Sequence, residues 1–239
     1  MSDLLALAVE SHGGLDRWNR FRTIDARLSI GGAIWSFKRQ AGLFDGVVFS
    51  AELHGERVSY QPFTAPNLRS VFVPGRLSLE TLDGELKTAW DRPRSHFSGL
   101  AYEAPWEPLH AVYFASCATW TYLTQPFLYT YPGFSTEEIA PWEENGEVWR
   151  RLKVTFPDYI ATHTREQITY FGSDGLMRRH DYDVEVLNGA SGANYPLAYK
   201  SFEGIQVPTA RRIFGRGKGN EKIPEPLLVA IDIAEVTFR

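Results

Sequence analysis

His180 is the histidine best placed for chemistry, because it stands beside acidic and tyrosine side chains in the segment FGSDGLMRRHDYDVEV, residues 171–186. An imidazole titrates near neutral pH and can serve as an acid, a base or a hydrogen-bonding group for a ligand. The segment alternates as a β-strand does, so neighbouring side chains point to opposite faces of a sheet. Whether His180 can reach a ligand therefore depends on which face is inward.

The turn that precedes this strand sets the orientation. Its sequence, Ser-Asp-Gly at 173–175, predicts a type I turn with Gly175 in the left-handed position of a bulge, so that Gly172 lies opposite Leu176. Counting back from that pair, we expect the more apolar face inward, with Glu166, Ile168, Tyr170, Arg178, His180, Tyr182 and Val184. We expect the other face to be solvated and charge-paired, with His163, Arg165, Gln167, Thr169, Arg179, Asp181, Asp183 and Glu185. A slip of one residue would reverse the assignment for one strand.

An inward His180 has three interpretations. It can be a core histidine satisfied by Glu166, Tyr182 or a backbone carbonyl. It can be a pocket histidine that Glu166 orients, or it can be a metal ligand. No pair of histidines has metal-binding spacing, and no nucleotide-binding or hydrolase motif occurs. We therefore predict neither a metal nor a cofactor.

Residues 105–127, PWEPLHAVYFASCATWTYLTQPF, predict the one long helix. Its apolar residues lie on nearly every face, so the helix must be buried on nearly every side. The candidate ligand-contacting residues on it are His110, Tyr113, Phe114 and Trp120. His110 can bind a ligand head group, or it can be a core histidine paired with a strand carbonyl. Cys117 lies in apolar company and is expected to be an inert thiol.

The 239-residue chain is 44% hydrophobic and has a net charge of −4. This composition is typical of a globular protein and gives no long-range attraction for nucleic acid. The first residues carry Asp3 where a signal peptide needs basic residues, and Glu10 interrupts the apolar run. The uncharged run 108–136 contains prolines and many polar residues, so we predict no transmembrane segment. We accordingly expect a cytoplasmic protein.

Short runs rich in valine, isoleucine and aromatic residues follow Thr23, and glycine-containing turns separate them about every ten residues, as in an antiparallel meander. Before them, Ser2 can cap a short helix that Gly13 and Gly14 end. We predict one mostly β domain over residues 1–239. In it, a strongly curved antiparallel sheet, either a half-barrel or a closed barrel, wraps around the buried central helix.

Several pieces of the sequence resemble the LolA/LolB/LppX type of lipoprotein carrier: the N-terminal helix ending in HGGLDRW, the strand TIDARLSI, and the hairpins PWEENGEVWRRLKVTF and YFGSDGLMRRHDY. The resemblance spans most of the chain. It implies a curved sheet that encloses a hydrophobic cavity for acyl chains.

These observations predict a protein that binds a hydrophobic or amphipathic small molecule between sheet and helix. Ile168, Tyr170, Val184 and the helix aromatics would supply apolar walls, with His180, Glu166, Tyr182 and Arg178 as polar groups. Arg178 would pair with an acidic head group. The basic residues Arg211, Arg212, Arg216, Lys218 and Lys222 are interpreted as a solvated strand end that could also contact such a head group.

Two other classes of function remain open from the sequence. The same cavity could belong to an enzyme in which His180 is the general base and Glu166 orients its imidazole. Alternatively, the chain could be a protein-interaction module that uses a strand edge or the basic loop.

Overall fold

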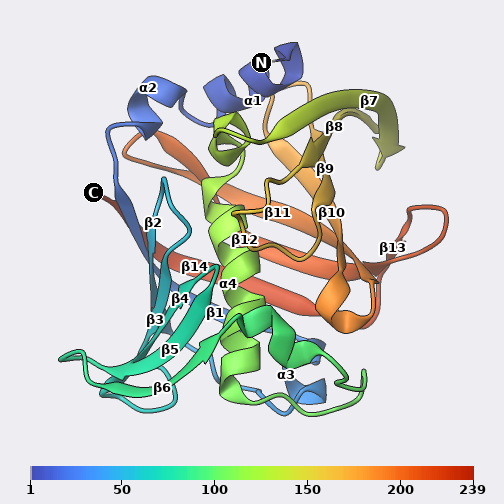
Figure 1. Ribbon diagram of the computed structural model, residues 1–239. Coiled ribbons are helices and arrows are strands. Elements are labelled where there is room, and N and C mark those ends of the chain that lie inside the picture. Colours follow the sequence, from blue (N-terminus) through green and yellow to red (C-terminus); the bar gives the residue numbers. More distant parts are fainter. Residues whose placement is uncertain (1) are drawn as a thin grey trace.

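The computed structural model describes residues 2–239 (Figure 1). The helices are α1 (Asp3–Ser11), α2 (Leu15–Trp18), α3 (Ala33–Phe37) and α4 (Pro108–Thr124), with the 3₁₀ turns η1 (Pro93–Phe97), η2 (Phe127–Thr130) and η3 (Glu185–Leu187). The strands of the first half are β1 (Thr23–Gly31), β2 (Val47–Glu52), β3 (Val58–Gln61), β4 (Leu68–Val73), β5 (Arg76–Thr81) and β6 (Leu86–Asp91). Those of the second half are β7 (Ser135–Glu144), β8 (Glu147–Thr155), β9 (Glu166–Phe171), β10 (Met177–Val184), β11 (Ala190–Phe202), β12 (Ile205–Arg216), β13 (Lys222–Ile223) and β14 (Val229–Phe238).

The strands form one antiparallel sheet in the order β6-β5-β4-β3-β2-β1-β14-β12-β11-β10-β9-β8-β7, with β13 beside β12. The first strand, β1, lies in the middle of this sheet, and each following strand pairs with the one before it, out to the edge strand β6. The chain then crosses to the opposite edge at β7 and returns inward until β14 pairs with β1, where Ile24 lies opposite Phe238. Among the described strands, β6 and β7 do not pair with each other, so the barrel stays open.

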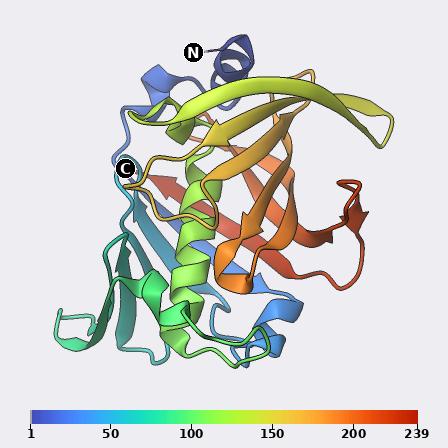
Figure 2. The same cartoon turned by 45° about the vertical axis from the view of Figure 1, so that its right-hand side comes forward.

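Helix α4 is the crossing between the two edges, and the curved sheet surrounds it (Figures 1 and 2). Every residue from Leu109 to Thr124 is buried. Pro108 starts the helix, where its missing N–H costs nothing, and Glu107 and His110 form a capping box over the first turn. The predicted curved sheet around a buried central helix is confirmed, in its half-barrel form.

The predicted N-terminal helix is also confirmed. The backbone N–H of Leu5 donates to the Ser2 hydroxyl at 3.3 Å, and the apolar residues Leu4, Leu5, Ala8 and Val9 are buried. This helix packs over the β9–β10 turn, where Gly175 has a φ of +76° and lies against Leu7 and Ser11.

The β9–β10 hairpin begins as predicted and then departs from the prediction. The Gly172 N–H donates to the Leu176 carbonyl at 2.9 Å, and Phe171 lies opposite Met177. The next pair, however, is Tyr170 with Arg179, because a β-bulge at Arg178 adds one residue to β10. The predicted register is therefore wrong by one residue from this point on, and every β9 side chain changes face relative to β10.

Candidate functional site

His180 points inward to α4 and lies among buried polar side chains. Its Nε2 donates to the Gln167 Oε1 at 2.6 Å, and its Nδ1 accepts from the Gln125 amide at 3.3 Å. This arrangement is that of a neutral imidazole protonated on Nε2. Burial, with the charge of Arg211 as a second cause, holds the pKa of His180 well below its usual value. His180 is thus an uncharged hydrogen-bonding group.

The polar side chains around His180 are called here the inner cluster: Tyr122, Gln125, Tyr129, Gln167, Thr169, His180, Tyr182, Asn194 and Arg211. They come from the C-terminal end of α4, from η2 and from β9 to β12. A chain of hydrogen bonds runs through the cluster, from the Gln125 amide to the Tyr129 hydroxyl at 2.6 Å and on to the Thr169 hydroxyl at 2.7 Å. The hydroxyls of Tyr122 and Tyr182 also hydrogen-bond to each other.

The inner cluster contains a buried charge. Arg211 is 2% exposed, and its Nη2 donates to the backbone carbonyl of Tyr122 at 2.7 Å. Its Nε and Nη1 have no hydrogen-bond partner within residues 2–239, and neither has the Asn194 side-chain amide. Buried polar groups in native proteins are nearly always paired, so this end of the interior can accept a polar ligand group.

An apolar void of about 10 Å³ lies next to the inner cluster, between α4 and the sheet. Its lining residues are Ile30, Trp35, Phe114, Ala115, Ala118, Thr119, Tyr122, His163, Tyr182, Val229 and Ile231. Tyr122 and Tyr182 belong to both regions, so the apolar void and the inner cluster adjoin. The void has about the volume of one water molecule; a larger ligand enters only if α4 and the sheet separate.

His163 was expected on the surface, but it is buried in the wall of this void. Its ring packs against Phe114 and Tyr182, with centroid distances of 4.7 and 5.2 Å. Neither ring nitrogen has a hydrogen-bond partner in the described chain. Burial, together with the charge of Arg94, lowers the pKa of His163 to about 3. It is a second neutral histidine that can bond to a ligand.

The structure separates the residues predicted to share the inward face. His180, Tyr182 and Val184 do point inward, as expected for β10. On β9 the prediction is wrong: Glu166, Ile168 and Tyr170 share the outer, convex face, because the bulge shifts the register. Gln167 and Thr169 take their place against His180.

Glu166 does not orient His180. Its side chain is 64% exposed and lies 3.2 Å from the Lys153 ammonium. The predicted acid–base pair of Glu166 and His180 is therefore not formed, and Gln167 holds the imidazole instead. An amide cannot take up a proton as a carboxylate can, so the arrangement does not supply the expected general-base dyad.

Arg178 also lies away from the inner cluster. It is the bulged residue of β10, and its guanidinium pairs with Asp174 at 2.8 Å and Glu147 at 3.4 Å near the hairpin turn. The prediction that Arg178 meets a ligand head group with His180 does not fit this position. The arginine that reaches the concave interior is Arg211, which was expected in a solvated patch.

The four helix candidates point in different directions. His110 accepts from the Glu107 N–H at 3.1 Å, and its Nε2 donates to the His96 carbonyl at 3.2 Å, so it is a paired capping residue. Trp120 Nε1 donates to the Glu52 carbonyl at 2.8 Å. Tyr113 faces Arg94. Only Phe114 lines the void.

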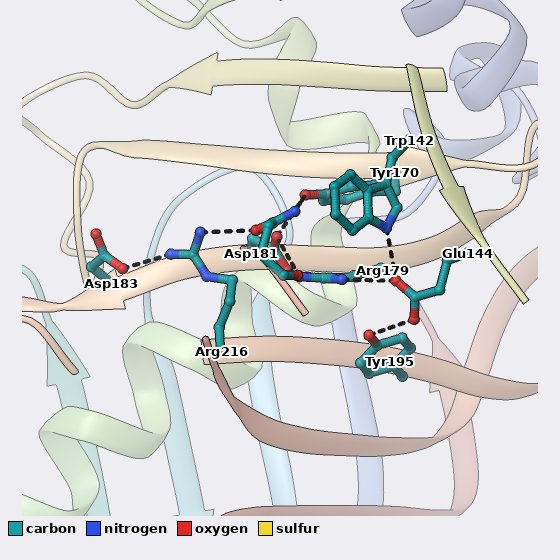
Figure 3. A network of polar contacts seen from close by, with 9 residues as sticks. Trp142, Glu144, Tyr170, Arg179, Asp181, Asp183, Tyr195 and Arg216 are labelled. Atoms are coloured by element: carbon teal, nitrogen blue, oxygen red, sulfur yellow. Dashed lines mark hydrogen bonds and ion pairs between the residues drawn. The ribbon is translucent and has the colours of Figure 1, made fainter. Parts of the chain in front are cut away.

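The outer face of β10 is a second polar cluster rather than a solvated surface (Figure 3). Arg179 is 0% exposed, and its Nε and Nη2 contact the two oxygens of Asp181 at 2.7 and 2.9 Å. Its Nη1 contacts Glu144 at 2.8 Å, and Tyr170 donates to Asp181 at 2.6 Å. The aromatic residues Trp142, Trp149, Tyr170 and Tyr195 cover the network. All these charges are paired within the chain, and the network links the hairpins of this half of the sheet.

Sequence reasoning missed Arg211, Asn194, Gln125 and Gln167. A signal for Arg211 is present in IQVPTARRIF, where Val207, Thr209, Arg211 and Ile213 are buried and the intervening Ala210 and Arg212 are more exposed. This alternation places Arg211 with three buried residues on one face of β12. For Gln167 no such signal exists, because its face depends on the bulge in the neighbouring strand.

No protein-family model and no curated protein matches the chain. Solved structures do match. A LolA superfamily protein from Nitrosomonas europaea aligns with a TM-score of 0.53 and 10% identity over 98% of this chain and 92% of that chain. The chain has the LolA-like fold. An outer membrane lipoprotein-sorting protein domain from Vibrio parahaemolyticus (TM-score 0.49, 10% identity, 98% and 92% coverage) and a DUF1329 family protein from Desulfovibrio piger (0.45, 14%, 98% and 91%) are also similar.

This comparison contradicts the predicted cytoplasmic location. The structure that aligns at a TM-score of 0.53 is that of a LolA superfamily protein, and this match stands against a cytoplasmic location. The prediction is wrong because it relied on the first residues of the sequence, and the point at which a given sequence begins does not decide where the protein resides. Within residues 2–239, no helix is both long and apolar enough to cross a membrane.

Proposed function

We propose that the protein binds a hydrophobic or amphipathic small molecule between α4 and the concave face of the sheet. The observation that carries this proposal is the apolar void beside the inner cluster, two regions that meet at Tyr122 and Tyr182. An apolar space with a few converging polar groups is the usual form of a small-molecule site. The LolA-like fold supports the same location.

The helix face over the void is made of small side chains. Ala115 and Ala118 lie there, opposite Val229 and Ile231 of β14. Small side chains interlock less deeply with a facing strand than leucine or phenylalanine would, so a shift of α4 away from the sheet disturbs fewer contacts. The polar groups at either side, the His163 imidazole and the Tyr122 and Tyr182 hydroxyls, can orient a ligand that enters.

The first test is native mass spectrometry of protein purified without detergent, followed by extraction of any molecule released on denaturation. We expect a stoichiometric amphipathic compound, or, for protein that emerges free of ligand, saturable binding of added decanol measured by displacement of a fluorescent hydrophobic dye. A ligand-free mass together with no saturable dye or decanol binding would contradict the proposal.

A variant that fills the void locates the site. Ala118→Leu adds a branched side chain where about 10 Å³ is free, so we expect binding to fall at least tenfold while the far-UV circular dichroism stays that of a folded sheet. Ala118→Ser changes the volume little and is the matched control. If both variants bind decanol as the parent does, the site does not lie under α4.

A further inference from the structure

Within the part of the chain that the structure describes, the guanidinium of Arg211 is a buried positive charge without a negative partner. Its Nη2 donates one hydrogen bond, to the Tyr122 carbonyl at 2.7 Å, while Nε and Nη1 have no partner in residues 2–239. No carboxylate of the described chain forms an ion pair with it, in contrast to Arg179 on the outer face. Burial of an unpaired charge is expensive, so proteins normally neutralise it.

The groups that surround Arg211 do not neutralise it. Its guanidinium carbon lies 4.7 Å from the centre of the Tyr122 ring, and Tyr129, Tyr182 and Tyr199 are close enough to interact with its charge. Burial lowers the pKa of Arg211 and raises those of these tyrosines, so the tyrosines stay neutral. His180 is neutral as well. The tyrosine ring and hydroxyls provide partial negative charge only.

A second unpaired group lies beside Arg211 on the same face. Asn194 on β11 is 0% exposed, and neither atom of its amide has a partner in the described chain. In register it pairs with His180 on β10 and with Ile213 on β12, which places it diagonal to Arg211. An anion at this point can therefore accept N–H groups from two side chains of neighbouring strands.

We propose that Arg211, assisted by Asn194, binds the carboxylate of an amphipathic ligand whose apolar chain lies between α4 and the sheet. The inference rests on the proposed function and assigns the class of ligand: a fatty acid or a similar monoanionic acid. A single positive charge matches a single negative charge, and N–H groups paired with a carboxylate form the stronger, charge-assisted type of hydrogen bond. The chain of the ligand passes Tyr122 and Tyr182 to reach the apolar void.

The competing explanation is that Arg211 has a structural role alone, since its bond to the Tyr122 carbonyl ties α4 to β12. A structural arginine would affect the binding of every ligand alike, or none. An anion-binding arginine affects only acids. Comparing the binding of decanoate with that of decanol separates these cases, because the two compounds have chains of equal length and differ in charge.

The test compares the binding of decanoate and decanol by competition with a hydrophobic dye, at about pH 7.5, where the acid is ionised. We expect the parent protein to prefer decanoate by about ten- to a hundredfold, the usual value of a hydrogen-bonded charged group. Arg211→Gln should abolish the preference for decanoate over decanol. Arg212→Gln is the matched control, because Arg212 is the next residue, points outward and pairs with Asp232 at 2.7 Å.

Each outcome decides a different point. A parent that binds both compounds equally, or a preference for decanoate that survives Arg211→Gln, would overturn the acid site and leave the proposed function standing. A parent that binds neither compound and also shows a ligand-free mass would refute the proposed function. The comparison of the two ligands on the parent needs no variant, so the inference stays testable even if Arg211→Gln does not fold.

Discussion

Arg179 and Arg211 are both buried in the same sheet, but they lie on opposite faces and differ in their partners. Arg179 donates to both oxygens of Asp181 and to Glu144. Within residues 2–239, Arg211 donates only to the carbonyl of Tyr122. The charge on the convex face is neutralised inside the chain, whereas no carboxylate of the described residues neutralises the charge on the concave face. The first arrangement stabilises the fold, and the second suits a site that receives an anion.

Asp181→Asn should destabilise the protein strongly. The change removes the negative partner that accepts two hydrogen bonds from Arg179 and leaves a fully buried cation with Glu144 as its remaining carboxylate. Breaking one side of a buried ion pair costs about 3–5 kcal/mol of unfolding free energy, which urea denaturation measures. Asp183→Asn is the control: Asp183 is half-exposed, pairs with Arg216, and should cost less than about 1 kcal/mol. Equal losses for the two variants would show that the convex network does not stabilise the sheet.

Protonation of Glu144 should make the protein less stable in acid. Burial raises the pKa of its carboxyl, but hydrogen bonds from Tyr195, Trp142 and Arg179 outweigh burial and lower it below the usual value. The unfolded carboxyl therefore takes a proton at a higher pH than the folded one. The stabilisation is complete above about pH 4.5 and is lost as the pH falls through the lowered pKa. Glu144→Gln should flatten this part of the curve of unfolding free energy against pH, and the exposed neighbour Glu143→Gln should not.

Two buried histidines should cause a second loss of stability in acid, which begins at a higher pH than that of Glu144. The pKa of His163 is about 3 and that of His12 about 4, chiefly because both are buried. Unfolded histidine takes a proton near pH 6.5, so the unfolding free energy should decrease as the pH falls from about 6.5 towards 4. His163→Phe should remove about one proton from the linkage and leave no unpaired ring nitrogen in the void wall. The exposed His54→Phe serves as the comparison; a pH dependence left unchanged by His163→Phe would contradict the buried, neutral state.

Gly175→Ala should separate α1 from the β9–β10 turn. Gly175 has a φ of +76°, and an added Cβ would clash with the Ser11 hydroxyl oxygen. The variant therefore combines backbone strain with a clash. Gly146→Ala has a similar φ of +78° but nothing within 4 Å, so it measures the strain alone. We expect about 1 kcal/mol for Gly146→Ala and at least about twice that for Gly175→Ala in urea denaturation. The same loss at both positions would mean that the contact with α1 is easily relieved.

Much of the architecture follows from local patterns in the sequence. The all-round apolar segment 105–127 predicts a helix that must be enclosed, and α4 is enclosed. Regular turns predict an antiparallel meander, and Ser-Asp-Gly at 173–175 predicts the observed start of the β9–β10 hairpin. These features depend on periodicity and turn chemistry, which a few neighbouring residues determine.

The sequence by itself thus determined the enclosed helix, the curved sheet and the inward direction of His180. Only the tertiary structure decided which residues meet His180. The bulge at Arg178 places Arg179 among Asp181, Glu144 and aromatic rings contributed by several other strands, and in doing so it turns Glu166 outward and Gln167 inward. Arg211 likewise contacts Tyr122, which lies 89 positions away in the chain. Such contacts depend on how distant segments pack, and local alternation carries no information about that packing.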